Sequence, residues 1–145
     1  MEEQSYAKHA KFVPLFHYFL LPLTLAAFLG SLFNLYRAIQ YDHNGMRVAL
    51  VLVVLSVAAI LTAFFARTFA LKAQDRAIRA EENLRHFVLT GKLLDKRLSV
   101  KQIIALRFAA DAELPDLARK AADGNLAPDA IKKSVKNWRV DTDRL

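Results

Sequence analysis

Two long apolar runs dominate the first half of the chain. Residues 14–36 contain no Asp, Glu, Lys or Arg over 23 positions, and residues 48–66 contain none over 19 positions. The hydrocarbon core of a bilayer requires about 20 residues of helix, so each run is long enough to cross it. Buried helices of a small soluble domain keep a polar stripe, which these runs almost lack. The pattern predicts transmembrane helix 1 over residues 14–36 and transmembrane helix 2 over residues 48–66.

The first run differs from a cleavable signal sequence. A signal peptide needs a basic start and a shorter apolar core, whereas this chain starts Met1-Glu2-Glu3 and its run is longer. We therefore expect an uncleaved anchor. Pro22 lies inside the run and is expected to kink the helix, because proline lacks an amide hydrogen.

The basic residues that flank the runs predict the orientation. The segment between the runs, residues 37–47, carries only two basic residues, whereas the twenty residues after Ala66 carry five, and the flank over residues 1–13 adds Lys8 and Lys11. By the positive-inside rule, residues 37–47 form a short external loop and both termini lie in the cytoplasm. Residues 67–145 carry seventeen basic and eleven acidic residues, which accounts for most of the net charge of +7. We expect a multi-pass protein of the bacterial inner membrane.

The second helix is expected to continue beyond the membrane. Neither glycine nor proline occurs between Gly45 and Gly91, and residues 67–89 favour helix, which predicts a juxtamembrane cytoplasmic helix over residues 67–89. Asp75–Arg79 and Glu81–Arg85 are spaced for helical ion pairs. Gly91 is expected to end the helix.

Small and apolar residues recur along this helix at alternating spacings of three and four. This helix-packing seam comprises Ser56, Ala59, Ala63, Ala66, Ala70, Ala73, Ala77, Ala80, Leu84 and Phe87. Such heptad spacing is that of packed helices, and small residues let two backbones approach closely. We expect Ser56–Ala66 to pack on a small face of the first helix, formed by Ala26, Ala27, Gly30 and Ser31. The remainder would pack on the C-terminal segment or on a second copy; alternatively, the spacing arises by chance, because alanine is common in helices.

The cytoplasmic segment over residues 90–145 is predicted to contain three short helices. Ser99 and Gln102 form a capping box that opens the first helix, Pro115 lies early in the second, and Pro128 begins the third. The third is expected to carry Ile131, Val135 and Trp138 on one face. So short a segment has too little core to be robust alone. We therefore expect it to dock on the juxtamembrane helix, on a partner or on lipid headgroups.

A basic patch surrounds Trp138 and comprises Lys132, Lys133, Lys136 and Arg139. Such a patch suits anionic lipid or nucleic acid, or it is an ordinary solvated helix face. Residues 98–145 carry nine basic and seven acidic residues, an excess of two. Phosphate binding needs a stronger positive charge, so we favour the solvated face and expect no nucleic-acid binding.

No pattern of catalytic or metal-binding residues is apparent. The chain has no cysteine, and its four histidines (His9, His17, His43 and His86) lack metal-ligand spacing. Neither apolar run contains an acidic residue for proton transfer. We predict no catalytic residue, cofactor, metal or small-molecule substrate, and no enzyme activity.

Four stretches of the chain carry a family resemblance. They are QSYA, FVP and FHY within residues 4–18, ARTFAL and QDR within 66–76, ALRFA and ELP within 105–115, and IKK and W within 131–138. In these stretches the chain resembles an uncharacterised bacterial family of small two-span membrane proteins, known as a domain of unknown function. The resemblance implies a two-span topology with a cytoplasmic tail, and no catalytic residues.

The first two stretches contain polar residues that flank the cytoplasmic ends of the two spans. This membrane-boundary polar cluster comprises Tyr6, His9, His17, Arg67, Gln74, Asp75 and Arg76. In a hairpin both sets lie at the same membrane depth. The cluster would hold the hairpin closed, bind a lipid headgroup or dock the C-terminal segment, and we favour an interfacial structural network.

The sequence therefore predicts an all-α membrane protein: a two-helix transmembrane hairpin, a long second helix that continues into the cytosol, and a small C-terminal helical module. The expected function is that of a structural or adaptor protein in the lipid bilayer. It would present the module to another copy, as a homo-oligomer, or to a membrane-complex partner. One alternative is an oligomeric channel or transporter accessory subunit, using Thr24, Asn34, Ser56 and Thr62. The other is a membrane-tethered nucleic-acid binder.

Overall fold

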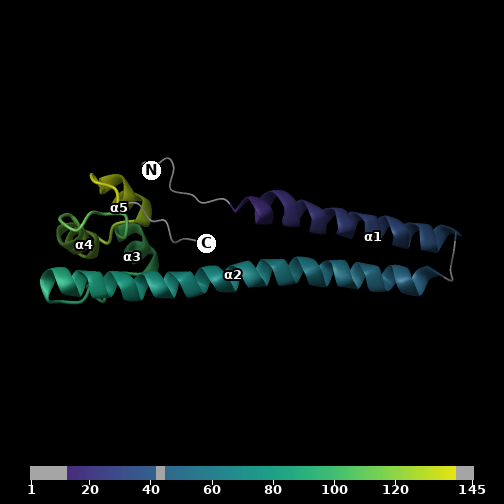
Figure 1. The fold of residues 1–145 in the computed structure, drawn as a ribbon, viewed down its shortest axis with the longest axis horizontal. Coiled ribbons are helices and arrows are strands. Elements are labelled where there is room, and N and C mark those ends of the chain that lie inside the picture. The colour runs from purple at the N-terminus through teal and green to yellow at the C-terminus, as the bar shows by residue number, and fades with distance from the viewer. Residues whose placement is uncertain (1–12, 42–44, 140–145) are drawn as a thin grey trace. The chain divides into compact units, whose positions relative to one another are not determined.

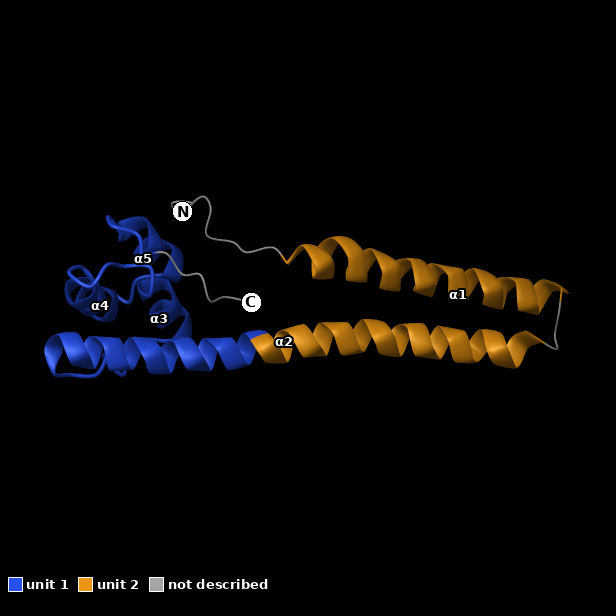
Figure 2. Ribbon diagram, viewed as in Figure 1, with its two compact units in different colours: residues 1–11, 71–145 blue, residues 12–70 orange. Residues whose placement is uncertain are grey.

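The computed structural model describes residues 13–41 and 45–139 (Figure 1). Its elements are, in order, η2 (Leu15–Leu20), α1 (Leu21–Tyr41), α2 (Met46–Thr90), α3 (Val100–Leu106), α4 (Leu114–Asp123) and α5 (Pro128–Ser134). Over the described residues the chain has helices and a single isolated β-bridge, so it is all-α as predicted. It divides into two compact units (Figure 2). In chain order, the first unit covers residues 12–70 and is drawn in orange, and the second contains residues 71–145 and is drawn in blue. Helix α2 runs through both units.

The first unit contains the apolar helices. Leu15–Tyr41 and Met46–Thr90 are long and apolar enough to cross a membrane, and only 6% and 11% of their most apolar windows are buried. A core helix of a soluble domain would be mostly buried. The helices are also longer than the predicted spans, because α1 continues to Tyr41 and α2 begins at Met46. Much of the predicted loop over residues 37–47 is therefore helical, and residues 42–44 lie outside the described part.

A π-helical segment opens the first apolar helix. Leu15–Leu20 is π-helical, and the amide of Leu21 donates to the carbonyl oxygen of Phe16, five residues earlier. Pro22 follows directly and has no amide hydrogen with which to continue the usual pattern. Pro22 was expected to kink the helix, and the structure has a wider, π-helical turn just before it, a rare irregularity of the kind found where helices bend.

The two helices of this unit contact each other along one stripe each. The least exposed residues are Thr24, Phe28, Ser31, Leu35 and Ala38 on α1, and Ala49, Val53, Ser56, Ile60 and Ala63 on α2. Both stripes follow the alternating spacing of helices that pack closely. The hydroxyl oxygens of Ser31 and Ser56 lie 3.1 Å apart, in hydrogen-bond contact.

The predicted small face of α1 is mostly wrong. Ser31 contacts Ser56 as expected, but Ala26, Ala27 and Gly30 are exposed, and nothing lies within 4 Å of the position that a Cβ on Gly30 would occupy. The less exposed stripe of α1 instead includes the larger Phe28 and Leu35, which make more van der Waals contacts than alanine.

Helix α2 is unbroken from Met46 to Thr90 and ends as predicted. Gly91 adopts a φ of +72°, and its amide donates to the carbonyl oxygen of Phe87 at 2.7 Å. This left-handed conformation suits glycine, which has no Cβ to clash with the backbone. It ends the helix and lets the chain turn back.

The second unit packs α3, α4 and α5 around a small apolar core. Its buried residues include Leu94, Leu98, Ile103, Ala105, Leu106, Ala109, Leu114, Leu117, Ala118, Ala121, Ala122, Ile131 and Val135. The capping box of Ser99 and Gln102 is present, and Pro115 and Pro128 lie in the first turns of α4 and α5. The three predicted helices are thus confirmed.

The placement of Trp138 on the third helix is wrong. Helix α5 ends at Ser134, because Val135 is extended with a ψ of 122°. Trp138 lies beyond the helix, forms an antiparallel β-bridge with Ala109, and packs its ring 4.9 Å from that of Phe108. It therefore covers the core from an extended segment, while Ile131 and Val135 are buried as expected.

Candidate functional site

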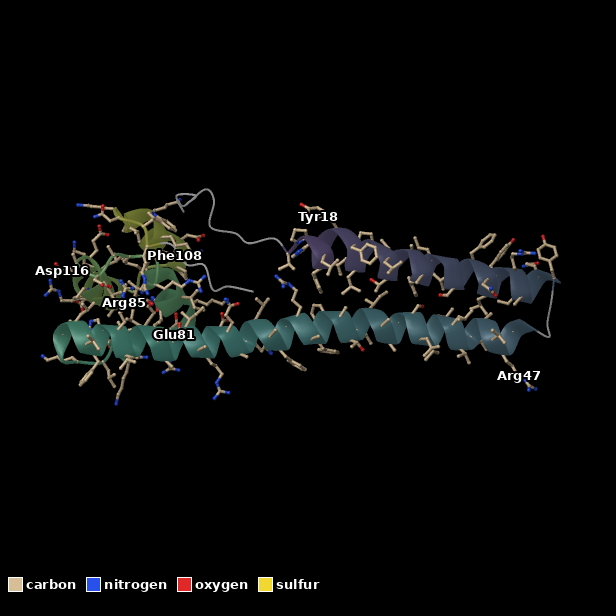
Figure 3. All side chains as sticks on the ribbon, in the orientation of Figure 1. Tyr18, Arg47, Glu81, Arg85, Phe108 and Asp116 are labelled. Atoms are coloured by element: carbon tan, nitrogen blue, oxygen red, sulfur yellow. The ribbon has the colours of Figure 1, made fainter. Side chains whose placement is uncertain are left out.

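One face of α2 carries the C-terminal module, and we call it the docking face. It is formed by the buried Ile78 and Glu82 and the half-buried Arg85. The Arg85 side chain lies on the side of α2 that faces the module (Figure 3). Arg85 donates to a carboxylate oxygen of Glu82 at 3.0 Å, to Asp111 at 2.7 Å and to the carbonyl oxygen of Ala109 at 2.8 Å. Arg85 thus links α2 to the segment between α3 and α4.

Glu82 is a buried carboxylate within this contact. Its side chain is 7% exposed, and the guanidinium groups of Arg85 and Arg139 lie at 3.0 and 3.7 Å. A buried charge needs such partners, because loss of hydration is otherwise too costly. The predicted pair of Glu81 with Arg85 is wrong, because Arg85 turns to the buried Glu82 and to Asp111.

Glu113 fixes the segment that follows α5. Its carboxylate accepts hydrogen bonds from the amides of Lys136 and Asn137 and from the side chain of Asn137, at 2.6–3.1 Å. The amide of Arg139 donates to the carbonyl oxygen of Phe108 at 2.8 Å. These bonds bring Arg139 to Glu82 and close the module over the docking face.

The four residues of the basic patch have separate surroundings. Lys132 is half-buried and lies 3.8 Å from Asp129, and Arg139 is paired with Glu82. Lys133 and Lys136 are exposed. Two of the four cations of the patch therefore lie beside acidic residues.

Only part of the predicted membrane-boundary polar cluster falls within the described residues. The guanidinium of Arg67 lies 5.0 Å above the ring of Phe16, a cation–π contact, and Nδ1 of His17 lies 2.9 Å from the carbonyl oxygen of Val13. The pairing of Arg67 with Phe16 was not predicted, because no local pattern signals it.

The other predicted members of the cluster lie outside this unit or outside the described residues. Tyr6 and His9 belong to the residues that are not described. Gln74, Asp75 and Arg76 lie on α2 in the second unit.

The helix-packing seam is largely exposed in the second unit. Its members there form what we call the open face: Ala73, Ala77, Ala80, Leu84 and Phe87. All five are exposed, Leu84 by 64% and Phe87 by 50%. Of the two partners expected for this part, the chain's own C-terminal segment does not cover it over residues 90–139, because the module occupies the docking face on the other side of α2. Packing on a second copy stays a prediction. Earlier in α2, Ser56 is buried, Ala63 and Ala70 are half-buried, and Ala59 and Ala66 are exposed.

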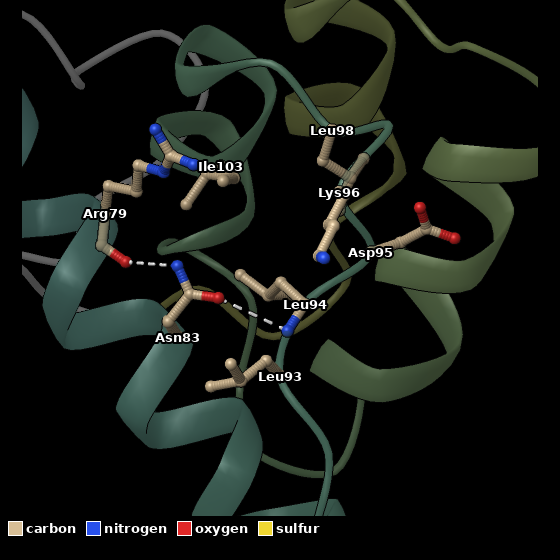
Figure 4. Close-up of a pocket in the computed structure, with 8 residues that line it drawn as sticks. All are labelled: Arg79, Asn83, Leu93, Leu94, Asp95, Lys96, Leu98 and Ile103. Atoms are coloured by element: carbon tan, nitrogen blue, oxygen red, sulfur yellow. Dashed lines mark hydrogen bonds between the residues drawn. The ribbon is translucent and has the colours of Figure 1, made fainter.

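A cleft lies where the chain returns from α2 to α3 (Figure 4). It has a volume of about 340 Å³ and is lined by Arg79, Asn83, Leu93, Leu94, Asp95, Lys96, Leu98 and Ile103. The Asn83 side chain accepts from the amide of Leu94 at 3.3 Å and donates to the carbonyl oxygen of Arg79 at 2.8 Å. Asn83 thereby holds the returning chain against α2.

The charges at this cleft are partly neutralised. Arg97 binds both carboxylate oxygens of Asp95 and also reaches Asp123 at 2.9 Å. Hydrogen bonding from Arg97 lowers the pKa of Asp95 from 3.8 to about 2. Arg79 and Lys96 also line this cleft, which was not predicted from the sequence.

Comparison with known proteins gives a family and no further relative. No curated protein and no solved structure matches the chain. The match that exists extends over the whole chain and so includes both apolar helices, the docking face and the C-terminal module. The chain belongs to DUF6526, a family of unknown function that matches residues 1–145.

Proposed function

We propose that this protein is a membrane-anchored adaptor of the bacterial inner membrane. In this proposal, α1 and the first half of α2 cross the bilayer as a hairpin with both termini in the cytoplasm. The second half of α2, with α3–α5 fastened to it, is a cytoplasmic platform that binds a partner protein, either another copy or a subunit of a membrane complex.

Several features support the membrane anchor. Both helices expose large apolar side chains on most of their circumference, including Phe33, Val54 and Phe64 at 60% or more. Exposed apolar surface of this extent is unfavourable in water and favourable in lipid. The hydrogen bond between Ser31 and Ser56 is typical of contacts between helices in a membrane.

The proposal that the platform binds a protein rests on the open face of α2. The module covers the docking face of the same helix. The open face is an apolar stripe that no described residue covers, formed by Ala73, Ala77, Ala80, Leu84 and Phe87. A contiguous apolar surface outside the membrane is typical of a protein interaction site. An amphipathic helix of this kind binds through residues spaced three and four apart.

The alternatives receive less support. A channel needs polar groups that line a shared path, but Thr24 donates to the carbonyl oxygen of Leu21, and Ser56 is buried against Ser31. A nucleic-acid binder needs clustered cations, and Lys132 and Arg139 are engaged with acidic residues. Neither arrangement favours the alternative function.

The topology is tested by labelling single cysteines, because the natural chain has none. His43→Cys and Lys101→Cys variants in intact cells would be exposed to a membrane-impermeant maleimide. The proposal expects His43→Cys to be labelled before lysis and Lys101→Cys only after it. The reverse pattern, or recovery of the protein in the soluble fraction, would contradict the membrane hairpin.

Partner binding is tested by photo-crosslinking in cells from positions 73 and 77, with identification of products by mass spectrometry. The proposal expects crosslinks to one defined protein, which includes another copy of this chain. A photo-crosslinker at Ile78, which is 7% exposed on the docking face, is the control and should crosslink only within the chain. If positions 73 and 77 crosslinked only to residues 98–145, the open face would be internal and the adaptor proposal would fail.

A further inference from the structure

We infer that the partner of the open face is a second copy of this chain, bound in parallel through α2. This inference rests on the proposed membrane anchor and names the partner that the adaptor proposal leaves open. It follows from the spacing of the apolar residues, the charges beside them and the direction in which α2 leaves the membrane.

The apolar residues of the open face occupy the two core positions of a heptad. Ala77 and Leu84 are seven residues apart and take position a, while Ala73, Ala80 and Phe87 take position d. Two helices with such a repeat pack along it with a left-handed twist. The three alanines allow close approach, and Leu84 and Phe87 supply the larger apolar area at the end of the stripe.

The charges beside the stripe favour one orientation. Arg76 occupies position g and Glu81 position e, and both side chains are exposed. In a parallel pair, position g of one helix lies beside position e of the next heptad in the other, so Arg76 meets Glu81 of the second copy twice. In an antiparallel pair, g lies beside g and e beside e, so these opposite charges do not meet.

These two charges are available for such pairing. No side-chain hydrogen bond or ion pair within residues 13–41 and 45–139 engages Arg76 or Glu81, whereas the nearby Glu82 and Arg85 are fully engaged in the docking face. The complementary charges therefore lie beside the uncovered face and not beside the covered one.

The proposed membrane anchor also favours the parallel orientation of the two α2 helices. Two copies inserted with the same topology direct their α2 helices into the cytoplasm in the same sense, so only parallel pairing is open to neighbours in one membrane. Ala59 and Ala66 hold position d earlier in α2 and are also exposed. They extend the same stripe toward the segment proposed to cross the bilayer.

Disulfide crosslinking in native membranes tests the inference on the full chain. Single-cysteine variants Ala73→Cys, Ala77→Cys and Ala80→Cys would be oxidised with copper phenanthroline and resolved without reductant. Lys72→Cys and Arg79→Cys, both exposed at position c, are the matched controls. We expect disulfide dimers at positions 73, 77 and 80 and at least about fivefold less at 72 and 79, because only a and d residues meet across a coiled coil. Equal crosslinking at all five positions, or none at the three seam positions, would overturn the inference.

Charge reversal tests the parallel orientation. In the Ala77→Cys background, Arg76→Glu and Glu81→Arg are each expected to lower the dimer fraction about fivefold, because attraction becomes repulsion at two sites. The double reversal should restore it. Failure of the double reversal to restore dimers, with the fluorescence of Trp138 unchanged as the check on folding, would overturn parallel pairing.

The failure of this inference is distinguishable from that of the adaptor proposal. If the photo-crosslinks from positions 73 and 77 reached one other membrane protein and no seam disulfide formed, the adaptor proposal would stand and the second copy would be excluded. If neither experiment gave a product, both would fail.

Discussion

The guanidinium of Arg85 donates a hydrogen bond of 2.8 Å to the carbonyl oxygen of Ala109. These residues are 24 positions apart, and the bond joins α2 to the segment that leaves α3. The same guanidinium also holds the buried carboxylate of Glu82 and the exposed Asp111. The Arg85 side chain therefore satisfies both the buried carboxylate of Glu82 on α2 and the carbonyl oxygen of Ala109 in the module.

Replacement of Arg85 by alanine is expected to destabilise the module strongly. The change leaves Glu82 with only Arg139 at 3.7 Å and leaves the Ala109 carbonyl without this donor. Removal of one partner from a buried pair costs about 3–5 kcal/mol. Trp138, the single tryptophan of the chain, lies in the module and reports its unfolding by fluorescence in detergent micelles.

Arg119→Ala is the matched control for this prediction. Arg119 also pairs with an acidic residue three positions away, but both side chains are 70% exposed. Exposed pairs contribute little, so the free energy of unfolding should change by less than about 1 kcal/mol. Equal effects of the two variants would show that Arg85 does not fasten the module.

Replacement of Gly91 by alanine is expected to destabilise the end of α2 by about 1 kcal/mol, because its φ of +72° is unfavourable for a residue with a Cβ. Nothing lies within 4 Å of the added Cβ, so the cost comes from the backbone alone. Gly91→Asn should cost less, since asparagine tolerates the left-handed region better. Hydrogen exchange of the amides of residues 87–91 measures the difference, and equal exchange in all three proteins would contradict the backbone explanation.

The interaction of Asp95 with Arg97 is expected to make the stability of the folded protein depend on pH. Its pKa is about 2 in the folded protein against 3.8 for the free side chain, because Arg97 stabilises the carboxylate. A lowered pKa means that the folded state prefers the charged form, so the contribution is complete above about pH 4 and disappears as the pH falls through 2. An NMR titration of the Asp95 carboxyl carbon measures this directly. In Arg97→Gln the midpoint should rise toward 3.8, and an unchanged midpoint would exclude Arg97 as the cause.

Replacement of Ser56 by leucine is expected to disrupt the contact between α1 and α2. Ser56 is buried against Ser31, and a larger side chain there costs about 1–3 kcal/mol by overpacking. Ser56→Ala removes only the hydrogen bond and should cost about 0.6 kcal/mol, because Ser31 still donates to the carbonyl oxygen of Phe28. Ala58→Leu, on an exposed position, is the control and should have little effect on unfolding in mixed micelles.

The helices were predictable because their signals are local. The interval without glycine or proline before Gly91 predicts the length of α2, and Ser99, Pro115 and Pro128 mark the starts of α3, α4 and α5. Helix capping and proline act on backbone groups only a few residues away, so the local sequence is enough to predict where these helices begin.

The contacts between helices were less predictable. Heptad spacing correctly marked Ser56 as a packing residue, but it did not show that Phe28 and Leu35, and not Ala26 and Ala27, would pack beside it. Small residues permit close packing without requiring it. Trp138 was misplaced because its bridge partner, Ala109, is 29 residues away, and no local pattern signals so distant a pairing.

The separation of the docking face and the open face on α2 has a thermodynamic consequence. Occupants of two sites compete only where they share atoms, and Ile78, Glu82 and Arg85 share none with Ala73, Ala77 and Ala80. A partner bound at the open face, as proposed, would therefore leave the module in place, and each occupant would change the affinity of the other only to the extent that the helix itself changes shape. A coupling free energy near zero would define α2 as a passive scaffold with two independent sites, and a measurable one would define it as a signal-carrying element.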